Sequence, residues 1–229
     1  MIIPLIFEDD YIIAVNKPHN ILIHKSHYAR NLKGPTLLDE LFNQQGASFY
    51  PIHRLDYKTS GVLLLCKKKE YVVKFQELFD QNLIQKTYRA IVRGFAPEKR
   101  TIDSPVKNAD TLKYKEALTE LKLLGQVSLN IPVHPYPGSR YSFVELSPKT
   151  GRMHQLRIHM NKISHPIVGD YKYGDRFHNR MFENELNCEN MFLHAFSVEF
   201  THPFTEKPLT INATFSDNWL RLFKKFNFN

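Results

Sequence analysis

A polar segment, residues 53–56 with the sequence HRLD, leads almost directly into the apolar run 62–65. That run is too short for a helix and rich in Val and Leu, which predicts a buried strand. A carboxylate next to a core strand costs free energy unless the charge is paired or used. Asp56 is therefore a candidate nucleophile or base. A turn in which Asp56 accepts bonds from neighbouring amides, with Thr59 and Ser60 close by, explains the same spacing.

The charge balance favours a polyanionic partner. The 229 residues carry a formal net charge of +8, and 42% of them are hydrophobic, which is enough for a sizeable core. The basic residues are spread along the chain, so the fold must gather them on one face if they are to bind nucleic acid.

The cysteine pattern predicts a reducing compartment. Cys66 and Cys188 form neither a framework of pairs nor a C-x-x-C motif, which favours the cytoplasm. Residues 1–4 lack a basic region and a long apolar segment, so we expect neither a signal peptide nor a membrane span.

Strand patterns are frequent and do not alternate regularly with helix patterns. This predicts an α+β fold around a largely antiparallel or mixed sheet, with no visible domain boundary. We expect strands over 11–15, 62–66, 86–94, 117–124, 141–146, 192–200 and 209–213. We expect helices over 37–43 (capped by Thr36), 70–82, 154–163 and 217–226, the last with Trp219, Leu220 and Phe223 facing inward.

Arg54 stands two residues before Asp56, so in an extended segment the two side chains point the same way. Arg54 could then enter a nucleic-acid helix while Asp56 reacts with the substrate. An ordinary surface cation is the alternative.

A second polar cluster, Arg152, His154, Gln155, Arg157 and His159, falls on one short predicted helix. Arg157 is a candidate partner for Asp56, because a nearby guanidinium keeps a carboxylate ionised. At about 4 Å, such a pair is worth roughly 4 kcal/mol at an effective dielectric near 20, before desolvation. A solvated basic helix face is the alternative. The histidines lack a carboxylate at the spacing of a zinc motif, so we expect no metal.

Tyr88 follows Lys86 on an expected strand, with Tyr88, Ala90 and Val92 on one face. Its ring is either an ordinary core tyrosine or a platform on which a base stacks.

Three separated blocks of the chain resemble the RluA-type pseudouridine synthases. They are HRLD with TSGV at 53–62, the strand beginning KTYRA at 86–94, and TGRMHQLRIH with HPI and GD at 150–170. Shorter matches are NKP at 16–18, LHA at 193–195 and THPF at 201–204, so the resemblance covers about 11–213. In its details the chain is most similar to the TruC-type branch, which acts on tRNA near the junction of the acceptor and T stems. We therefore expect no separate S4-like domain.

The resemblance implies a single catalytic domain over residues 1–229, with a mixed sheet split by a central cleft and flanked by helices. It implies that Asp56 is the catalytic aspartate, that Arg157 pairs with it, and that Tyr88 stacks on a flipped base. The residues that it places against the RNA are Arg54, His53, Lys86, Leu156, Arg152, His154 and Gln155.

The implied activity is isomerisation of uridine to pseudouridine, with uridine 65 of tRNA as the expected target. The reaction breaks N1–C1′ and forms C5–C1′ without adding or losing a group, so we expect that it needs no cofactor or metal. We also expect the protein to be a monomer. Three alternatives stay open: a ribosomal RNA target, a non-catalytic RNA-binding module, and a metal-dependent RNA hydrolase that uses the histidines.

Overall fold

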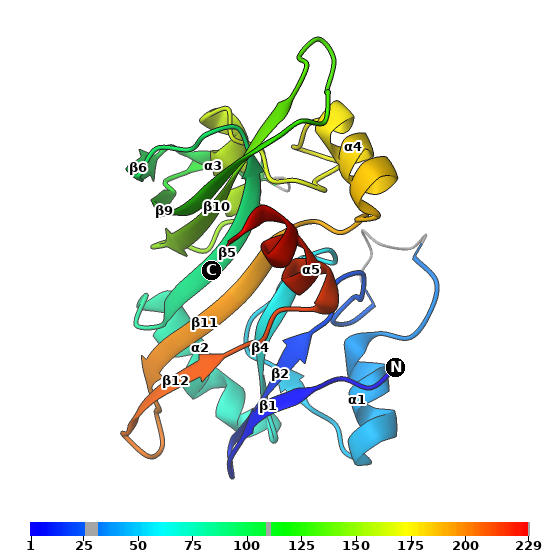
Figure 1. The fold of residues 1–229 in the computed structure, drawn as a ribbon. Helices are drawn as coiled ribbons and strands as arrows, with labels where there is room; N and C mark the ends of the chain where they lie inside the picture. Colours follow the sequence, from blue (N-terminus) through cyan, green and yellow to red (C-terminus); the bar gives the residue numbers. More distant parts are fainter. Residues whose placement is uncertain (26–31, 109–110, 229) are drawn as a thin grey trace. The chain divides into compact units, whose positions relative to one another are not determined.

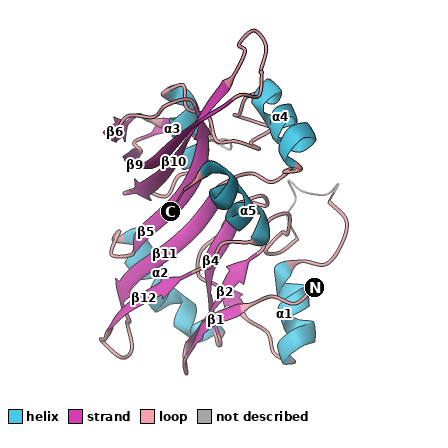
Figure 2. Ribbon diagram, viewed as in Figure 1, coloured by secondary structure: helices cyan, strands magenta, loops and turns pink. Residues whose placement is uncertain are grey.

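The computed structural model describes residues 1–25, 32–108 and 111–228, which form two compact units of strands and helices (Figures 1 and 2). The first unit comprises Met1–Lys86 and Ala195–Thr214, and the second comprises Thr87–His194 and Phe215–Asn229. The chain passes from one unit to the other three times: inside two strands, between residues 86 and 87 and between 194 and 195, and after β12, between residues 214 and 215. No linker composition marks these points, so the sequence showed no boundary. The single catalytic domain stays a prediction.

The first unit contains a mainly antiparallel sheet. Strands β1, β2, β4 and β11 lie side by side in that order, and in addition β12 pairs with β11 and β3 pairs with β4. The strands are β1 (Leu5–Glu8), β2 (Ile12–Lys17), β3 (Tyr50–Pro51), β4 (Ser60–Cys66), β11 (Leu193–Thr201) and β12 (Pro208–Asn212). Its helices are α1 (Leu37–Gln45) and α2 (Val72–Asp80), the latter preceded by the 3-10 turn η2 (Lys69–Tyr71). Every residue of β4 is buried, as the apolar run predicted.

Helix α1 begins where the sequence predicted. The hydroxyl of Thr36 accepts a bond from the backbone N–H of Asp39, and the Asp39 carboxylate accepts one from the backbone N–H of Thr36. This reciprocal cap satisfies two donors that the first turn leaves unpaired.

Gly61 brings two strands of this unit into unusually close contact. Its φ is +112°, and a Cβ built on it would lie 2.1 Å from the carbonyl oxygen of Ala195. Only glycine fits such a backbone conformation and such an approach. The strand that follows Asp56 is thereby held against β11.

In the second unit, the strands β5, β10, β9 and β6 lie side by side in that order and pair antiparallel, while β7 and β8 form a separate two-stranded sheet. The strands are β5 (Gln85–Arg93), β6 (Lys99–Asp103), β7 (Val106–Lys107), β8 (Tyr114–Lys115), β9 (Leu118–Leu129) and β10 (Ser139–Pro148). The helices are α3 (Gln155–Lys162), α4 (Arg176–Leu186) and α5 (Asp217–Phe226).

Alternating side chains of β5 face two different cores of the second unit. Ile91 joins the cluster that contains residues of α4 and α5, whereas Ala90 and Val92 join the cluster that contains Leu156 and Met160 of α3. Tyr88, half-buried, packs against the α3 cluster, as the predicted alternation requires. The sheet therefore fixes α3 on the face that carries Tyr88.

The structure differs from the expectations in several places. Helix α4 and the strands β1, β3, β6, β7 and β8 were not predicted, and β9 extends to Leu129 instead of ending at 124. Helix α5 has the expected bounds, but Leu220 is 52% exposed and Leu222 is buried beside Trp219 and Phe226. The inward face of α5 is thus the one that carries residues 219, 222 and 226, because these positions lie on one side of a helix.

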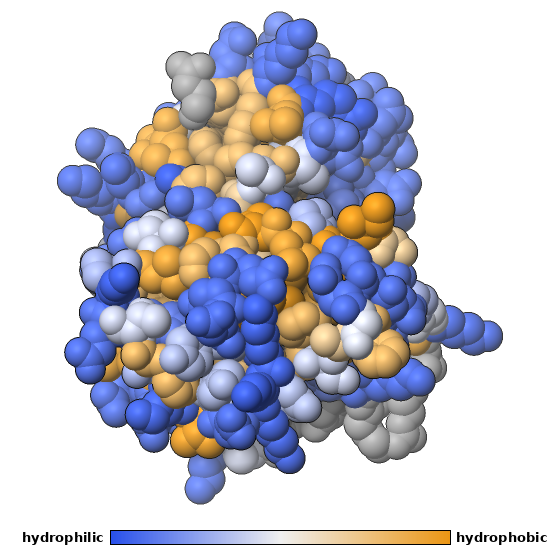
Figure 3. Space-filling model, turned by 90° about the horizontal axis from the view of Figure 1, so that it is seen from below, coloured by the Kyte–Doolittle hydropathy of each residue, from blue (hydrophilic) through white to orange (hydrophobic). Residues whose placement is uncertain are grey.

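Hydrophilic side chains cover much of the face shown in Figure 3, and apolar ones form smaller patches between them. Within the part of the chain that the structure describes, no helix is both long and apolar enough to span a membrane.

Candidate active site

Asp56 lies in a short turn that connects the polar segment 53–56 to β4. The backbone N–H of Thr59 donates to the carbonyl oxygen of Asp56 at 3.1 Å, which closes the turn. The Asp56 side chain is half-buried, Arg54 is exposed, and Thr59 is buried. The turn therefore places a carboxylate at the start of the core strand, with a cation on the surface two residues earlier.

Lys17, at the end of β2, is buried directly beneath this turn. Its ammonium donates to the carbonyl oxygens of Pro18 (2.9 Å), Tyr57 (3.1 Å) and Thr59 (2.8 Å). Burial lowers the pKa of Lys17 to about 7, and the nearby negative charge of Asp56 acts in the opposite direction. The lysine thus binds the turn through two of its carbonyls and places positive charge close to Asp56.

Sequence reasoning gave Lys17 no role, although residues 16–18 were among the blocks of the resemblance. Lysine is rarely buried in proteins, so its type predicted an exposed side chain. Only the pairing of Lys17 with Gly61 across β2 and β4 brings it under the turn.

His53 and Lys86, both expected to contact RNA, lie together in the first unit around Phe79. The His53 ring centroid is 4.9 Å from that of Phe79, and the Lys86 ammonium is 5.7 Å from the same ring. The backbone N–H of Leu64 donates to His53 Nε2 at 3.0 Å. Burial lowers the pKa of His53 to about 4, and the charge of Lys86 adds to this effect. His53 therefore supports β4 as a neutral ring, and its contact with RNA stays a prediction.

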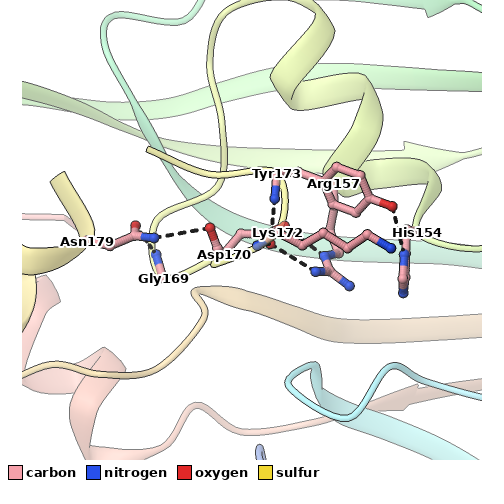
Figure 4. Close-up of polar contacts among 7 residues, drawn as sticks. All are labelled: His154, Arg157, Gly169, Asp170, Lys172, Tyr173 and Asn179. Carbon is pink, nitrogen blue, oxygen red and sulfur yellow. Dashed lines mark hydrogen bonds and ion pairs between the residues drawn. The ribbon is translucent and has the colours of Figure 1, made fainter. Parts of the chain in front are cut away.

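In the second unit, Arg157 is a buried guanidinium that forms a two-bond ion pair with Asp170 (Figure 4). Arg157 Nε donates to Asp170 Oδ2 at 2.7 Å, and Nη2 donates to Oδ1 at 2.9 Å. The side chains of Arg157 and Asp170 are 10% and 1% exposed. The solvated helix face that was the alternative for Arg157 is therefore wrong.

Asp170 is held ionised by its surroundings. Burial by itself would raise the pKa of Asp170, but the Arg157 guanidinium and the backbone N–H groups of Tyr173 and Lys172 outweigh burial and lower it. In the sequence, residues 169–170 stand out only as part of the family resemblance. The residues around a loop aspartate form no pattern that reveals its ion-pair partner.

The other polar residues in and just before α3 form hydrogen bonds mainly within the second unit. Gln155 is buried, accepts bonds from Thr150 Oγ1 and the backbone N–H of Arg152, and donates to Leu118 O and Thr119 Oγ1. Arg152 also donates from Nε to Glu116 O at 3.0 Å. Both residues therefore have structural contacts, and their contact with RNA stays a prediction.

The histidines of this block have separate partners. His154 Nδ1 is 3.0 Å from the Tyr173 hydroxyl, and His159 uses both ring nitrogens, with Thr119 Oγ1 at 3.0 Å and Ser104 O at 2.8 Å. Among the residues that the structure describes, no three His, Cys, Asp or Glu side chains gather as metal ligands.

Tyr88 and Leu156 meet at one apolar cluster of the second unit. Leu156, on α3, is 7% exposed and belongs to the cluster against which the Tyr88 ring packs, together with Val144 and Leu146 of β10. An aromatic ring beside aliphatic side chains is a surface on which a planar base can stack.

The predicted site residues thus fall into two groups, one in each unit. The first unit holds His53, Arg54, Asp56 and Lys86. The second unit holds Tyr88, Arg152, His154, Gln155, Leu156 and Arg157. The pairing of Asp56 with Arg157 concerns residues of different units and stays a prediction.

Comparison with known proteins shows that most of the chain is similar to one enzyme family. The family model described as RNA pseudouridylate synthase matches residues 11–162. The chain is 40% identical over its full length to tRNA pseudouridine synthase C of Haemophilus ducreyi, of which it covers 98%. It is 37% identical to the protein of the same name from Vibrio parahaemolyticus, over 98% of this chain and 95% of the relative.

Solved structures agree with these matches. Human RNA pseudouridylate synthase domain containing 1 superposes with a TM-score of 0.74 and 25% identity, over 93% of this chain and 84% of the human one. Human RNA pseudouridylate synthase domain containing 4 has the same fold, with a TM-score of 0.75 at 23% identity, over 99% of this chain and 94% of the human one. The matching family model and the nearly full-length relatives show that the chain belongs to the RNA pseudouridylate synthase family of isomerases.

Proposed function

We propose that this protein is a tRNA pseudouridine synthase of the TruC type that isomerises uridine 65 of tRNA. The observation that carries the proposal is the nearly full-length identity of 37% and 40% to proteins named tRNA pseudouridine synthase C. The net charge of +8 fits a polyanionic substrate and predicts binding that weakens as salt rises. We further propose that the protein acts in the cytoplasm as a monomer, without a cofactor or metal.

Asp56 is the proposed catalytic aspartate. The turn that carries it is bonded to the buried ammonium of Lys17, whose protonated form is favoured by the nearby negative charge of Asp56. An ionised carboxylate is what nucleophilic attack requires. Arg157 is the proposed ion-pair partner of Asp56, supported by the resemblance of the block around it and by its burial as a cation.

The chemistry rearranges one nucleoside. The N1–C1′ bond breaks, the C5–C1′ bond forms, the proton at C5 is lost, and N1 ends as N–H, so atoms and electrons balance. Asp56 adds to the base ring in one route and assists departure of the base at C1′ in the other. In both routes the freed uracil has to turn inside a pocket that excludes water.

A uridine paired in a stem hides its glycosidic bond, so the enzyme has to turn it out of the helix at a cost of a few kcal/mol. Arg54, exposed before the turn, is the residue proposed to take the vacated place in the RNA. Tyr88 is proposed to stack on the everted base, with Leu156 packed beside it. Such stacking stabilises by roughly 1–3 kcal/mol per base.

The substrate is tested with transcribed tRNA and fragments of ribosomal RNA, assayed separately for pseudouridine. We expect modification of the tRNA at position 65 and none in a tRNA that carries cytidine there. Modification of the ribosomal fragments alone would leave the chemistry standing and overturn the tRNA assignment. No pseudouridine in either RNA, together with cleaved chains that disappear on chelation, would favour the hydrolase alternative.

A further inference from the structure

The ion pair between Arg157 and Asp170 is built so that the guanidinium has one orientation. Asp170 takes the edge of the guanidinium that carries Nε and Nη2, at 2.7 and 2.9 Å. Two parallel bonds fix the plane of the group as well as its position, which a single contact to a point charge does not. A second carboxylate that binds Arg157 would then accept its hydrogen bond from Nη1.

Asp170 is fixed by its backbone neighbours. Oδ1 accepts the N–H of Lys172 at 2.9 Å and that of Tyr173 at 3.1 Å, which folds residues 170–173 into a turn around the carboxylate. The Asp170 carbonyl oxygen accepts the N–H of Gly174 at 2.9 Å and the side-chain amide of Asn179 at 3.1 Å. Asp170 is therefore tied to its own turn through its carboxylate and to helix α4 through its backbone carbonyl.

The face of the Arg157 guanidinium is covered as well as its edge. The centre of the group lies 5.1 Å from the centroid of the Tyr173 ring, and the Tyr173 hydroxyl is 3.0 Å from His154 Nδ1 (Figure 4). A cation over an aromatic face gains about 0.5–2 kcal/mol, depending on how far it is desolvated. Edge and face contacts together leave little freedom to this side chain.

We infer that Asp170 is a positioning residue for the reaction: it sets the orientation in which Arg157 meets the catalytic carboxylate, with Tyr173 supporting the same guanidinium. The inference rests on the proposed function. It gives a role to the turn 170–173, whose residues bind their own unit and are not placed against the base.

Asp170→Asn tests the inference, because it keeps the size of the side chain and removes the charge and one acceptor. We expect kcat for tRNA to fall on the order of 100-fold, as for a catalytic group displaced by about 1 Å. The tRNA dissociation constant should stay within about threefold, because the change removes no phosphate contact. Equal kcat for the wild type and the variant would overturn the inference.

Asp175→Asn is the matched control. The Asp175 carboxylate also accepts two backbone N–H groups, from Phe177 and His178, and it pairs with Arg93 Nη1 at 2.5 Å. Its loss should destabilise the same unit to a similar degree and leave kcat within about threefold of the wild type, since Asp175 makes no bond to Arg157 in the described contacts. A drop in kcat as large as that of Asp170→Asn would assign the effect to general loosening and overturn the inference.

A double-mutant cycle separates positioning from an independent role. If Asp170 acts through Arg157, kcat of the double variant Arg157→Lys with Asp170→Asn should be close to that of Arg157→Lys alone. Losses that multiply would overturn the inference.

Should Asp170→Asn fail to fold, Tyr173→Leu carries the test, with Tyr173→Phe as its control. The leucine should lower kcat and keep tRNA binding, whereas the phenylalanine, which keeps the ring over Arg157, should stay near the wild type. Wild-type kcat in Tyr173→Leu would overturn the inference. The proposed function is decided separately, by whether the wild-type protein forms pseudouridine in tRNA.

Discussion

The ammonium of Lys17 lies 2.8 Å from the carbonyl oxygen of Thr59, inside the turn that begins at Asp56. A cation bonded to backbone carbonyls and otherwise buried is costly, and it is tolerated here because the turn satisfies its donors. The same contact joins the end of β2 to the turn that carries Asp56, the proposed catalytic aspartate.

Lys17→Met should change how stability depends on pH. The pKa of Lys17 is about 7 in the folded protein and 10.5 when exposed, so the unfolded chain binds more protons between these values. The stability of the wild type should therefore rise with pH from about 7 to 10, by at most about 1.4 kcal/mol per pH unit from this group, and fall again as pH drops toward 7.

The methionine variant lacks this group, so the difference in unfolding free energy between wild type and variant should grow with pH. Urea denaturation at pH 7, 8 and 9 measures it, with Lys99→Met, an exposed lysine of β6, as the control. Parallel curves for wild type and Lys17→Met would contradict the buried-lysine account.

Asp56→Asn should abolish turnover while RNA binding survives. We expect kcat to fall about a thousandfold or more, because the amide cannot act as a nucleophile or base. Pseudouridine formation in tRNA and a filter-binding titration measure the two effects, and Asp80→Asn at the exposed end of α2 is the control. Full pseudouridine formation by Asp56→Asn would refute the catalytic role. If the wild type itself forms none and binds RNA as well as Asp56→Asn does, the non-catalytic module gains support.

Tyr88→Phe and Tyr88→Leu should behave differently. The phenylalanine keeps a ring against the cluster around Leu156, so much of the stacking remains. The leucine loses the stack, worth roughly 1–3 kcal/mol, and should lower kcat/KM by about 5- to 150-fold more than the phenylalanine. Equal kcat/KM for the two variants would remove the stacking role.

Gly61→Ala should destabilise the first unit by roughly 3 kcal/mol or more, since the φ of +112° and the carbonyl of Ala195 leave no room for a methyl group. Gly151→Ala, where a Cβ would have no neighbour within 4 Å, should cost far less. Urea unfolding of the two variants gives the comparison. Similar midpoints for both would show that β4 and β11 can separate at little cost.

Elements whose pattern is local were predictable from the sequence. Strand β4 is a continuous apolar run, α3 lies within the predicted 154–163, and Thr36 caps α1 through a side chain three residues from its partner. The candidate residues around Asp56 and Arg157 were found for the same reason, because each block is contiguous in the chain.

What the sequence did not reveal depends on partners far along the chain. Only Ile102 of strand β6 is buried, so this edge strand has no alternating pattern. Helix α4 is rich in polar residues, and its buried face even includes Asn179, which bonds the backbone of Gly169 and Asp170. Lys17 and Asp170 are buried by distant strands and turns, whereas their residue types predict exposure.

The first unit takes its last two strands from the far end of the chain, since β11 and β12 supply Ala195–Thr214. A ribosome must therefore finish residue 214 before the nascent chain can complete the sheet that begins with β1. A fragment ending near Lys86 would leave the edge of β4 without its neighbour and open to aggregation. During synthesis, the sheet that supports the turn bearing Asp56 is therefore completed only after almost the whole chain has been made.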